Sequence, residues 1–292
     1  MLIRLLKKKV QWLAKHSWIV GLVLFIAAPV TWAAIYALAF SLGGVGRLST
    51  GWTVEYWQRS ISEGFLTNSI VHSLYISGVV TSLVIVGAIC SSALLSELRH
   101  SRLLSAILLT QSATPAVVVA TQTNHWVGPG GVLSRLAFHC GWIESPNAFP
   151  AIVQDPWSIG VIVAITLTLL PLAILYFMNL WDTIGMDRYC QLAEQLGCTP
   201  WQTKIKIAIP MLLRRGNALS ILVFLLAIGS YEIPLLLDRQ TPQMFSVATQ
   251  RRSEQFNLMN RPESFALATV YFALCTALLF LYIRQRSVRD ER

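Results

Sequence analysis

Long apolar stretches almost without charge are the feature that most constrains how this chain of 292 residues can fold. The hydrocarbon core of a bilayer is about 30 Å thick, and an α-helix needs about 20 apolar residues to cross it. Six stretches meet this requirement, and Glu232 is the one charged residue inside them; they cover residues 18–40, 70–95, 103–123, 157–180, 217–237 and 264–283. The sequence therefore predicts an all-α, polytopic membrane protein with six transmembrane helices in a single transmembrane domain over residues 1–292.

The composition agrees with a membrane protein and argues against nucleic-acid binding. Charged residues make up 13% of the chain and hydrophobic residues 54%, whereas soluble globular proteins carry about 25% charged residues. The formal net charge is +9, but the basic residues flank the apolar stretches and form no face interleaved with stacking aromatic side chains. We therefore expect the lipid bilayer, and no nucleic acid, among the partners of this chain.

The distribution of Lys and Arg predicts the orientation of the spans. If the amino terminus lies inside, the inner segments are 1–17, 96–102, 181–216 and 284–292, and they hold 16 of the 23 Lys and Arg residues. Cytoplasmic loops carry such an excess of basic residues, so both termini are predicted to be cytoplasmic. Trp157 and Trp181 lie near the ends of the fourth span, where an interfacial aromatic belt is expected.

Several catalytic motifs are absent from the sequence. It contains no G-x-x-x-x-G-K-[ST] loop, no H-E-x-x-H and no G-x-S-x-G, and its five cysteines form no C-x-x-C pair. We therefore expect no catalytic residues, no metal site and no cofactor. Any ATP that the protein uses must be hydrolysed by another chain.

The longest inner segment has the pattern of two short helices separated by a break. The spacing predicts a helix over Met186–Leu196, which Gly197 would end. Thr199 is predicted to cap the next helix, with Gln202 completing a capping box. That second helix is expected to end at Pro210, since a proline interrupts a helix.

The same segment resembles the EAA motif of ABC importer permeases, in which E-A-A is followed by three residues, Gly, nine residues and I-x-L-P. Here Gly197 is followed by nine residues and then by I-A-I-P at 207–210, so the spacing matches. The E-A-A positions fall on residues 191–193, where only the alanine is kept. The run over 229–243 also looks like the end of the fifth span in the branch that imports ferric iron, polyamines, thiamine or sulfate.

The resemblance covers most of the chain, because six spans with a long cytoplasmic loop between the fourth and the fifth are similar to the type I importer permease fold. It implies a place in the bacterial inner (plasma) membrane and ATP hydrolysis by separate cytoplasmic ABC ATPase subunits. It also implies an extracytoplasmic solute-binding protein and a second permease subunit. We favour a sister chain over a homodimer, because permeases of the branch that this chain resembles work as two paired permease halves.

The resemblance further implies that segment 181–216 couples the permease to the ATPase by entering a groove of that subunit. The residues assigned to coupling are Gln191, Leu192, Ala193, Leu196, Gly197, Trp201, Ile207 and Pro210. Within this set, Gly197 would permit the sharp turn, and Leu196 and Trp201 are candidate apolar anchors. The residues alone leave a second interpretation open, in which the segment is a structural pair of helices that packs beneath the membrane and binds no partner.

Three polar side chains in the predicted spans are candidates for the translocation path, namely Gln111, Thr114 and Glu232. An ionisable residue within a span is a functional candidate by default. The alternatives are interhelical hydrogen bonds for the first two, and contact with headgroups or pairing with Arg239 for Glu232, which lies near the outer end of its span.

The alternative function for the whole chain is an ion-gradient-driven secondary transporter. Such a protein needs intramembrane carboxylates or broken helices that hold ions, and Glu232 is the one carboxylate that qualifies. The outer loop 238–262 carries four arginines, which either attract an anionic solute or an acidic partner or are simply solvated; they are Arg239, Arg251, Arg252 and Arg261.

Overall fold

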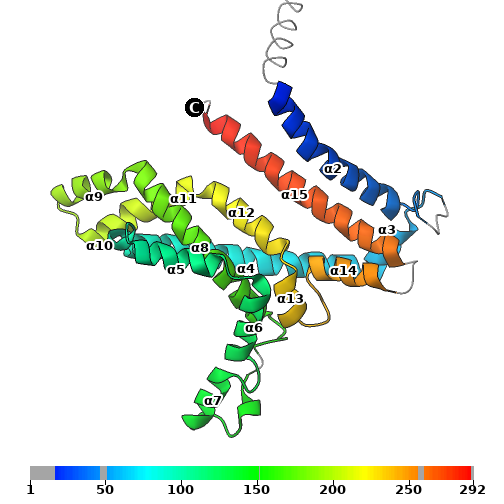
Figure 1. Cartoon of the computed structure of the whole chain (residues 1–292), viewed down its shortest axis with the longest axis horizontal. Helices are drawn as coiled ribbons and strands as arrows, with labels where there is room; N and C mark the ends of the chain where they lie inside the picture. Colours follow the sequence, from blue (N-terminus) through cyan, green and yellow to red (C-terminus); the bar gives the residue numbers. More distant parts are fainter. Residues whose placement is uncertain (1–16, 47–50, 151, 256–259, 291–292) are drawn as a thin grey trace, which may run out of the picture. The chain divides into compact units, whose positions relative to one another are not determined.

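The structure is a computed structural model that describes residues 17–46, 51–150, 152–255 and 260–290. Every regular element in these ranges is a helix (Figure 1), which confirms the predicted all-α class. The chain divides into two compact units, one formed by residues 1–63 and 252–274 and the other by residues 64–251 and 275–292.

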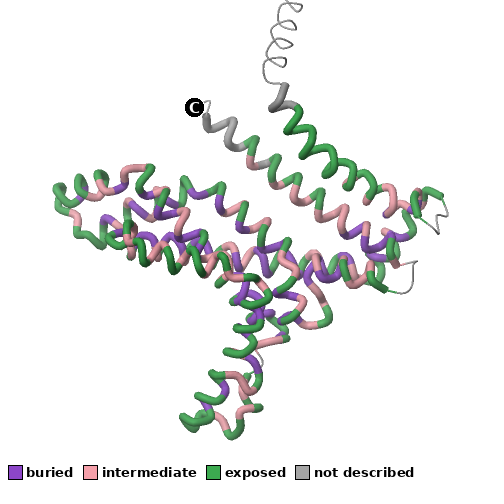
Figure 2. Tube along the Cα trace, in the orientation of Figure 1, coloured by how far each residue is buried: buried purple, intermediate pink, exposed green. Residues whose placement is uncertain are grey.

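The first unit contains α2 (Ser17–Ser41), α3 (Glu55–Ser62) and the beginning of α15 (Arg261–Asp290). The apolar side chains of α2 are exposed along most of its length (Figure 2), with Phe25 exposed at 80%. The ring of Phe265 lies 4.4 Å from that of Phe40 and 6.0 Å from that of Tyr36, measured between centroids. An apolar helix that exposes its side chains on all sides is typical of a membrane span.

An ion network joins α3 to the beginning of α15. The carboxylate of Glu263 is fully buried and accepts a hydrogen bond from Nε of Arg252 at 2.8 Å. Arg252 also lies 3.2 Å from the Glu63 carboxylate, which accepts a bond from Nε of Arg59 at 3.0 Å. The hydrogen bond from Arg59 lowers the pKa of Glu63. Arg252 is therefore part of an ion network, whereas its sequence position suggested either a solvated charge or one that attracts an external anion.

The second unit is built around two long helices, α4 (Phe65–Leu94) and α8 (Ile159–Ile184), which pack along each other. Between them the chain forms η1 (Ser96–Leu98), α5 (Arg102–Ser112), α6 (Ala116–Val127), α7 (Val132–His139) and η2 (Pro146–Ala148). After α8 it forms α9 (Met186–Gln195), α10 (Pro200–Thr203), the π-helical turn η3 (Lys204–Ala208), α11 (Ile209–Arg215), α12 (Asn217–Ile228), α13 (Glu232–Leu237) and most of α14 (Phe245–Glu254), whose residues from Arg252 on belong to the first unit.

The core of this unit lies where α4, α8 and α12 meet. Ile76, Val80 and Val84 recur every four residues along α4 and are fully buried, as expected for one face of a helix. They belong to the same buried cluster as Phe177 of α8 and Val223 of α12. Figure 2 shows buried positions along these helices. The packing gives the unit a firm frame from which the shorter helices project.

Four helices in the described ranges are long and apolar enough to cross a membrane. They run from Gly21 to Ser41, from Phe65 to Leu94, from Ile159 to Ile184 and from Arg261 to Arg284. The number rises to six if each of two sharply bent helix pairs is counted as one span. The predicted spans 70–95 and 157–180 correspond to α4 and α8, whose ends differ from the predicted ones by several residues.

The third predicted span, 103–123, is not one helix. α5 ends at Ser112, α6 begins at Ala116, and the helical directions differ by 94° across this break. Pro115 explains the break, because a proline disfavours helical backbone at the residue before it and has no N–H to donate.

The fifth predicted span, 217–237, is wrong as a continuous helix. α12 ends at Ile228, and α13 starts at Glu232 after a break that contains Gly229. Glycine has low helix propensity, and Pro234 lies in the first turn of α13, where its missing N–H leaves no helical bond unmade. The segment 238–262, predicted as a polar loop, also contains a helix, α14. Its buried residues include Phe245 and Val247. The polar residues around them in the sequence leave no helical pattern of apolar residues, so the helix was not predicted.

Candidate functional site

The segment between α8 and α12 begins with α9, whose end is fixed by a glycine. Gly197 has a φ of +90°, in the left-handed region that favours glycine. Its N–H donates to the carbonyl of Glu194 at 3.0 Å, and the N–H of Cys198 donates to the carbonyl of Ala193 at 3.0 Å. This pair of bonds is a Schellman motif. The predicted helix over Met186–Leu196 and its termination at Gly197 are confirmed to within one residue.

The predicted capping box is also present. Thr199 Oγ1 accepts a bond from the N–H of Gln202, and Gln202 Oε1 accepts one from the N–H of Thr199, both at 3.3 Å. The prediction that this helix ends at Pro210 is wrong, because the chain continues through η3 into α11. A proline in an α-helix clashes with the carbonyl four residues back, and the π turn immediately before Pro210 changes that local pairing.

The segment separates a buried side from an exposed apolar side. Leu192, Leu196 and Trp201 are exposed at 56%, 86% and 60%, whereas Ala193 is 5% exposed and faces the rest of the chain. The leucines are four residues apart and share one face at the end of α9. Buried side chains that anchor the segment are Met186, Thr203, Ala208 and Leu212. The two leucines therefore leave an apolar face at the end of α9 that the rest of the described chain does not cover.

The other residues predicted for coupling lie on the same segment with different exposure. Gln191 and Pro210 are exposed, and Ile207 is half-buried. All the predicted coupling residues therefore fall within one stretch from α9 to α11.

One arginine, which the sequence did not single out, fixes the segment to the rest of the unit. Nε of Arg99 donates to Oδ1 of Asp182 at 2.7 Å, and its Nη2 contacts Oδ2 of Asp187. Its Nη1 donates to the carbonyl of Ser96 at 2.6 Å. Trp181 donates from Nε1 to Asp187 Oδ1 at 2.9 Å and is only 3% exposed, so its side chain packs inside the protein at the end of α8.

The chemistry of the segment offers no reactive thiol at its centre. Burial, and then the nearby carboxylates of Asp187 and Glu194, raise the pKa of Cys190. The thiol is therefore protonated at neutral pH and is a poor nucleophile. Within the described part of the chain, no group of three His, Cys, Asp or Glu side chains is placed to hold a metal ion.

The three polar side chains predicted for the translocation path lie near the two helix breaks. Gln111 is half-buried at the end of α5, and Thr114 Oγ1 donates to the carbonyl of Thr110 at 3.1 Å. Glu232 is exposed at the start of α13, and α13 packs against α6. Among the described residues, no ion pair joins Glu232 to Arg239.

A serine, a histidine and an aspartate come together at the opposite end of α8. His72 Nε2 lies 3.0 Å from Asp238 Oδ2 and 3.4 Å from Ser158 Oγ, and Ser158 Oγ donates to Asp238 Oδ1 at 2.7 Å. In a catalytic triad the serine and the aspartate bond to different ring nitrogens of the histidine. Here both face the same nitrogen, so the cluster ties α4, the start of α8 and the end of α13 together and does not activate a nucleophile.

Apolar helices of membrane-spanning length, joined by a capped helical segment with exposed apolar side chains, define a polytopic helical membrane protein. The chain belongs to the family of binding-protein-dependent transport system inner membrane components, whose sequence profile matches residues 84–285. It is a type I ABC importer permease, and a multi-pass protein of the inner membrane. A search of curated proteins finds no match.

A solved structure has the same fold. The crystal structure of a bacterial ABC transporter involved in the import of the acidic polysaccharide alginate is similar with a TM-score of 0.70. The similarity covers 99% of this chain and 100% of the other, at 18% sequence identity. It confirms the expected importer-permease fold.

Proposed function

We propose that this chain provides part of the solute path of an ABC importer and couples to a separate cytoplasmic ATPase through segment 181–216. The observation that carries the coupling is the pair of exposed leucines, Leu192 and Leu196, beside a capped and anchored turn. An amphipathic helix with an exposed apolar face fits a hydrophobic groove of a partner. Because the segment is anchored, it can pass a rigid-body movement of that partner to the membrane helices. The chain itself then catalyses no covalent reaction and needs no cofactor.

The family to which the chain belongs supports a solute-binding protein as a further partner. A solute-binding protein delivers the solute on the outer side, and a second permease subunit completes the path, with a sister chain favoured over a homodimer. In this arrangement both termini are cytoplasmic and segment 238–262 lies outside. Reporter fusions after Arg215 and after Arg252 test the orientation, with cytoplasmic activity expected for the first and outer activity for the second. The reverse pattern would overturn it.

The helix breaks support the proposed path past Gln111, Thr114 and Glu232. Irregular backbone at membrane depth is tolerated only where protein covers it or where it lines a water-filled cavity. Glu232→Gln tests this role in vesicles that contain the assembled transporter. If Glu232 contacts a cationic solute, uptake of that solute should be weaker in the variant, while unchanged uptake kinetics would remove Glu232 from the path.

The coupling proposal is tested with two matched substitutions. Leu192 and Leu136 are exposed at 56% and 58%, but Leu136 lies on α7, outside the segment. Each is replaced by Glu in the full chain, and the ATPase subunit that co-purifies from native membranes is quantified. Burying an unpaired carboxylate in an apolar groove is unfavourable. We therefore expect the amount of ATPase that co-purifies with Leu192→Glu to be about tenfold lower than with the wild type, or lower still.

The control variant tests the coupling role of the segment, and the energy source of uptake distinguishes an ABC importer from a secondary transporter. Leu136→Glu should retain the ATPase at the wild-type level, which would assign the loss to the segment and not to an added charge. Equal retention by both variants would refute the coupling role. Uptake that follows an ion gradient without ATP would refute the importer function and favour the secondary transporter.

A further inference from the structure

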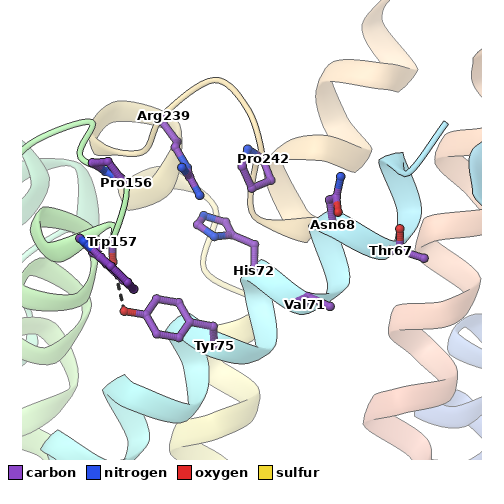
Figure 3. A pocket seen from close by; sticks show the side chains of 9 residues that line it. All are labelled: Thr67, Asn68, Val71, His72, Tyr75, Pro156, Trp157, Arg239 and Pro242. Carbon is purple, nitrogen blue, oxygen red and sulfur yellow. Dashed lines mark hydrogen bonds between the residues drawn. The ribbon is translucent and has the colours of Figure 1, made fainter.

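The second unit contains a cavity of about 330 Å³ at the end of α8 that is opposite to α9. α8 has 26 residues, so its two ends are about 39 Å apart. The walls of the cavity come from the first turns of α4, from the residues just before α8 and from the segment after α13 (Figure 3). This α4–α8 cavity is therefore a separate feature from the coupling segment.

Arg239 gives the cavity its charge. It is the one Lys or Arg side chain in the lining, which contains no Asp or Glu, and Figure 3 shows it reaching toward His72. Its Nε atom is buried and has no hydrogen-bond partner among the residues that the structure describes. A buried donor without an acceptor is unfavourable, so an acceptor that enters the cavity would satisfy it.

The neighbouring carboxylate is fully engaged and does not neutralise this arginine. Oδ2 of Asp238 lies 3.0 Å from His72 Nε2. Its Oδ1 accepts bonds from Ser158 Oγ at 2.7 Å and from the backbone N–H of Arg239 at 2.9 Å. No carboxylate of the described residues forms an ion pair with the Arg239 guanidinium, whereas Arg252, on the same predicted outer loop, is bound by Glu263. The guanidinium is thus available to an external anion.

The other walls suit the body of a small organic molecule. The Trp157 and Tyr75 side chains stand beside each other (Figure 3), with the Tyr75 hydroxyl 3.5 Å from the Trp157 carbonyl oxygen. Trp157 is exposed at 67% and Tyr75 at 40%, so flat apolar surface is open to a ligand. Asn68 adds a polar group on the α4 side. Ligand sites are typically concave and mostly apolar, with a few polar groups that fix orientation.

We propose that the α4–α8 cavity binds a small organic oxyanion. Its carboxylate or phosphate pairs with Arg239, and its carbon framework lies against Trp157 and Tyr75. Ligand cavities measure about 300–1,000 Å³, so this one takes a single headgroup-sized or monosaccharide-sized body and no polymer. Two sources supply this chemistry, namely the headgroup of a phospholipid and a soluble solute.

The test uses the full chain, purified in detergent and stripped of lipid, without any ATPase, so it does not depend on the proposed function. One probe is phosphatidylglycerol, counted on the intact chain by native mass spectrometry. The second is inorganic phosphate, titrated by calorimetry. Arg239→Gln is compared with Arg251→Gln, which removes the same charge from a half-buried arginine on α14. Trp157→Ala changes the aromatic wall without changing the charge, and the side chain that it removes is exposed at 67%.

Removing a charge-assisted hydrogen bond should weaken binding about tenfold. If the lipid is the source, phosphatidylglycerol binds about tenfold more weakly to Arg239→Gln and several-fold more weakly to Trp157→Ala, and Arg251→Gln binds it normally. If a soluble solute is the source, phosphate affinity falls in Arg239→Gln alone and lipid binding is the same in all variants. The proposal is overturned if neither probe distinguishes Arg239→Gln from Arg251→Gln. If Arg239→Gln does not fold, it is overturned when Trp157→Ala retains wild-type lipid binding and the wild-type chain binds no phosphate.

Discussion

Replacing Gly197 by alanine tests how the end of α9 is held. A Cβ atom at this position would have no heavy atom within 4 Å, so the substitution introduces no clash. The cost is conformational, because the φ of +90° lies in a region where an L side chain costs about 1–2 kcal/mol. That energy corresponds to an increase of about 5- to 30-fold in the opening of the helix end.

Hydrogen exchange on the purified chain measures this opening directly. The reporters are the amides of Gly197 and Cys198, which donate the two bonds of the Schellman motif. Their exchange should rise about 5- to 30-fold in Gly197→Ala. Gly78→Ala is the control, because its Cβ would also have no atom within 4 Å but its backbone is helical in α4. The control should not loosen its helix, since alanine is the better helix former.

The outcome that would refute this reasoning is specific. Unchanged exchange at the end of α9 in Gly197→Ala would mean that the left-handed backbone does not hold the turn. Equal loosening of α4 in Gly78→Ala would mean that any added methyl group, and not the φ value, is responsible.

Three further perturbations follow from the contacts of single side chains. Arg99→Gln should raise amide exchange in α9 at least about tenfold, because it removes charge-assisted bonds to two aspartates; unchanged exchange would show that packing alone holds the helix. Cys190 should react with iodoacetamide more slowly than the exposed Cys140, because its pKa is raised, and mass spectrometry of timed samples measures both rates. Equal rates would contradict the shielding of Cys190. The bond from Arg59 lowers the pKa of Glu63 in the folded chain. The pair therefore stabilises the fold at a pH above the unfolded-state pKa of Glu63, near 4.5, and this stabilisation is lost as the pH falls through the lower pKa of the folded state. Glu63→Gln should therefore have a melting temperature that falls less than that of the wild type between about pH 5 and about pH 3, and parallel curves would contradict this.

Features that depend on neighbouring residues were predictable from the sequence. The end of α9 and the capping box involve bonds between residues at most five positions apart, from Ala193 to Cys198 and from Thr199 to Gln202. The positions of α4 and α8 also follow from local composition, because absence of charge over 20 or so residues is enough to indicate a span.

Features that depend on distant residues or on helix direction were not predictable. Pro115 indicates that the helix is interrupted there, but neither the proline nor the apolar composition around it gives the 94° angle of the bend. Arg99 lies 83 residues from Asp182, and nothing in its local sequence identifies its partners. The sequence suggested Glu232 as a partner of Arg239, but only the folded chain determines which arginines of the loop lie close to a carboxylate.

The bonds of Arg99 have a mechanical consequence for any force that reaches α9. A helix that is attached to the rest of the protein at one end only can rotate about that attachment, so a displacement of its other end is lost as bending. Arg99 provides a second attachment for α9. It lies in the connection between α4 and α5 and contacts Asp182 at the end of α8 and Asp187 at the start of α9. Under the proposed coupling, a displacement of α9 would therefore reach two connections at once, the one before α5 and the end of α8.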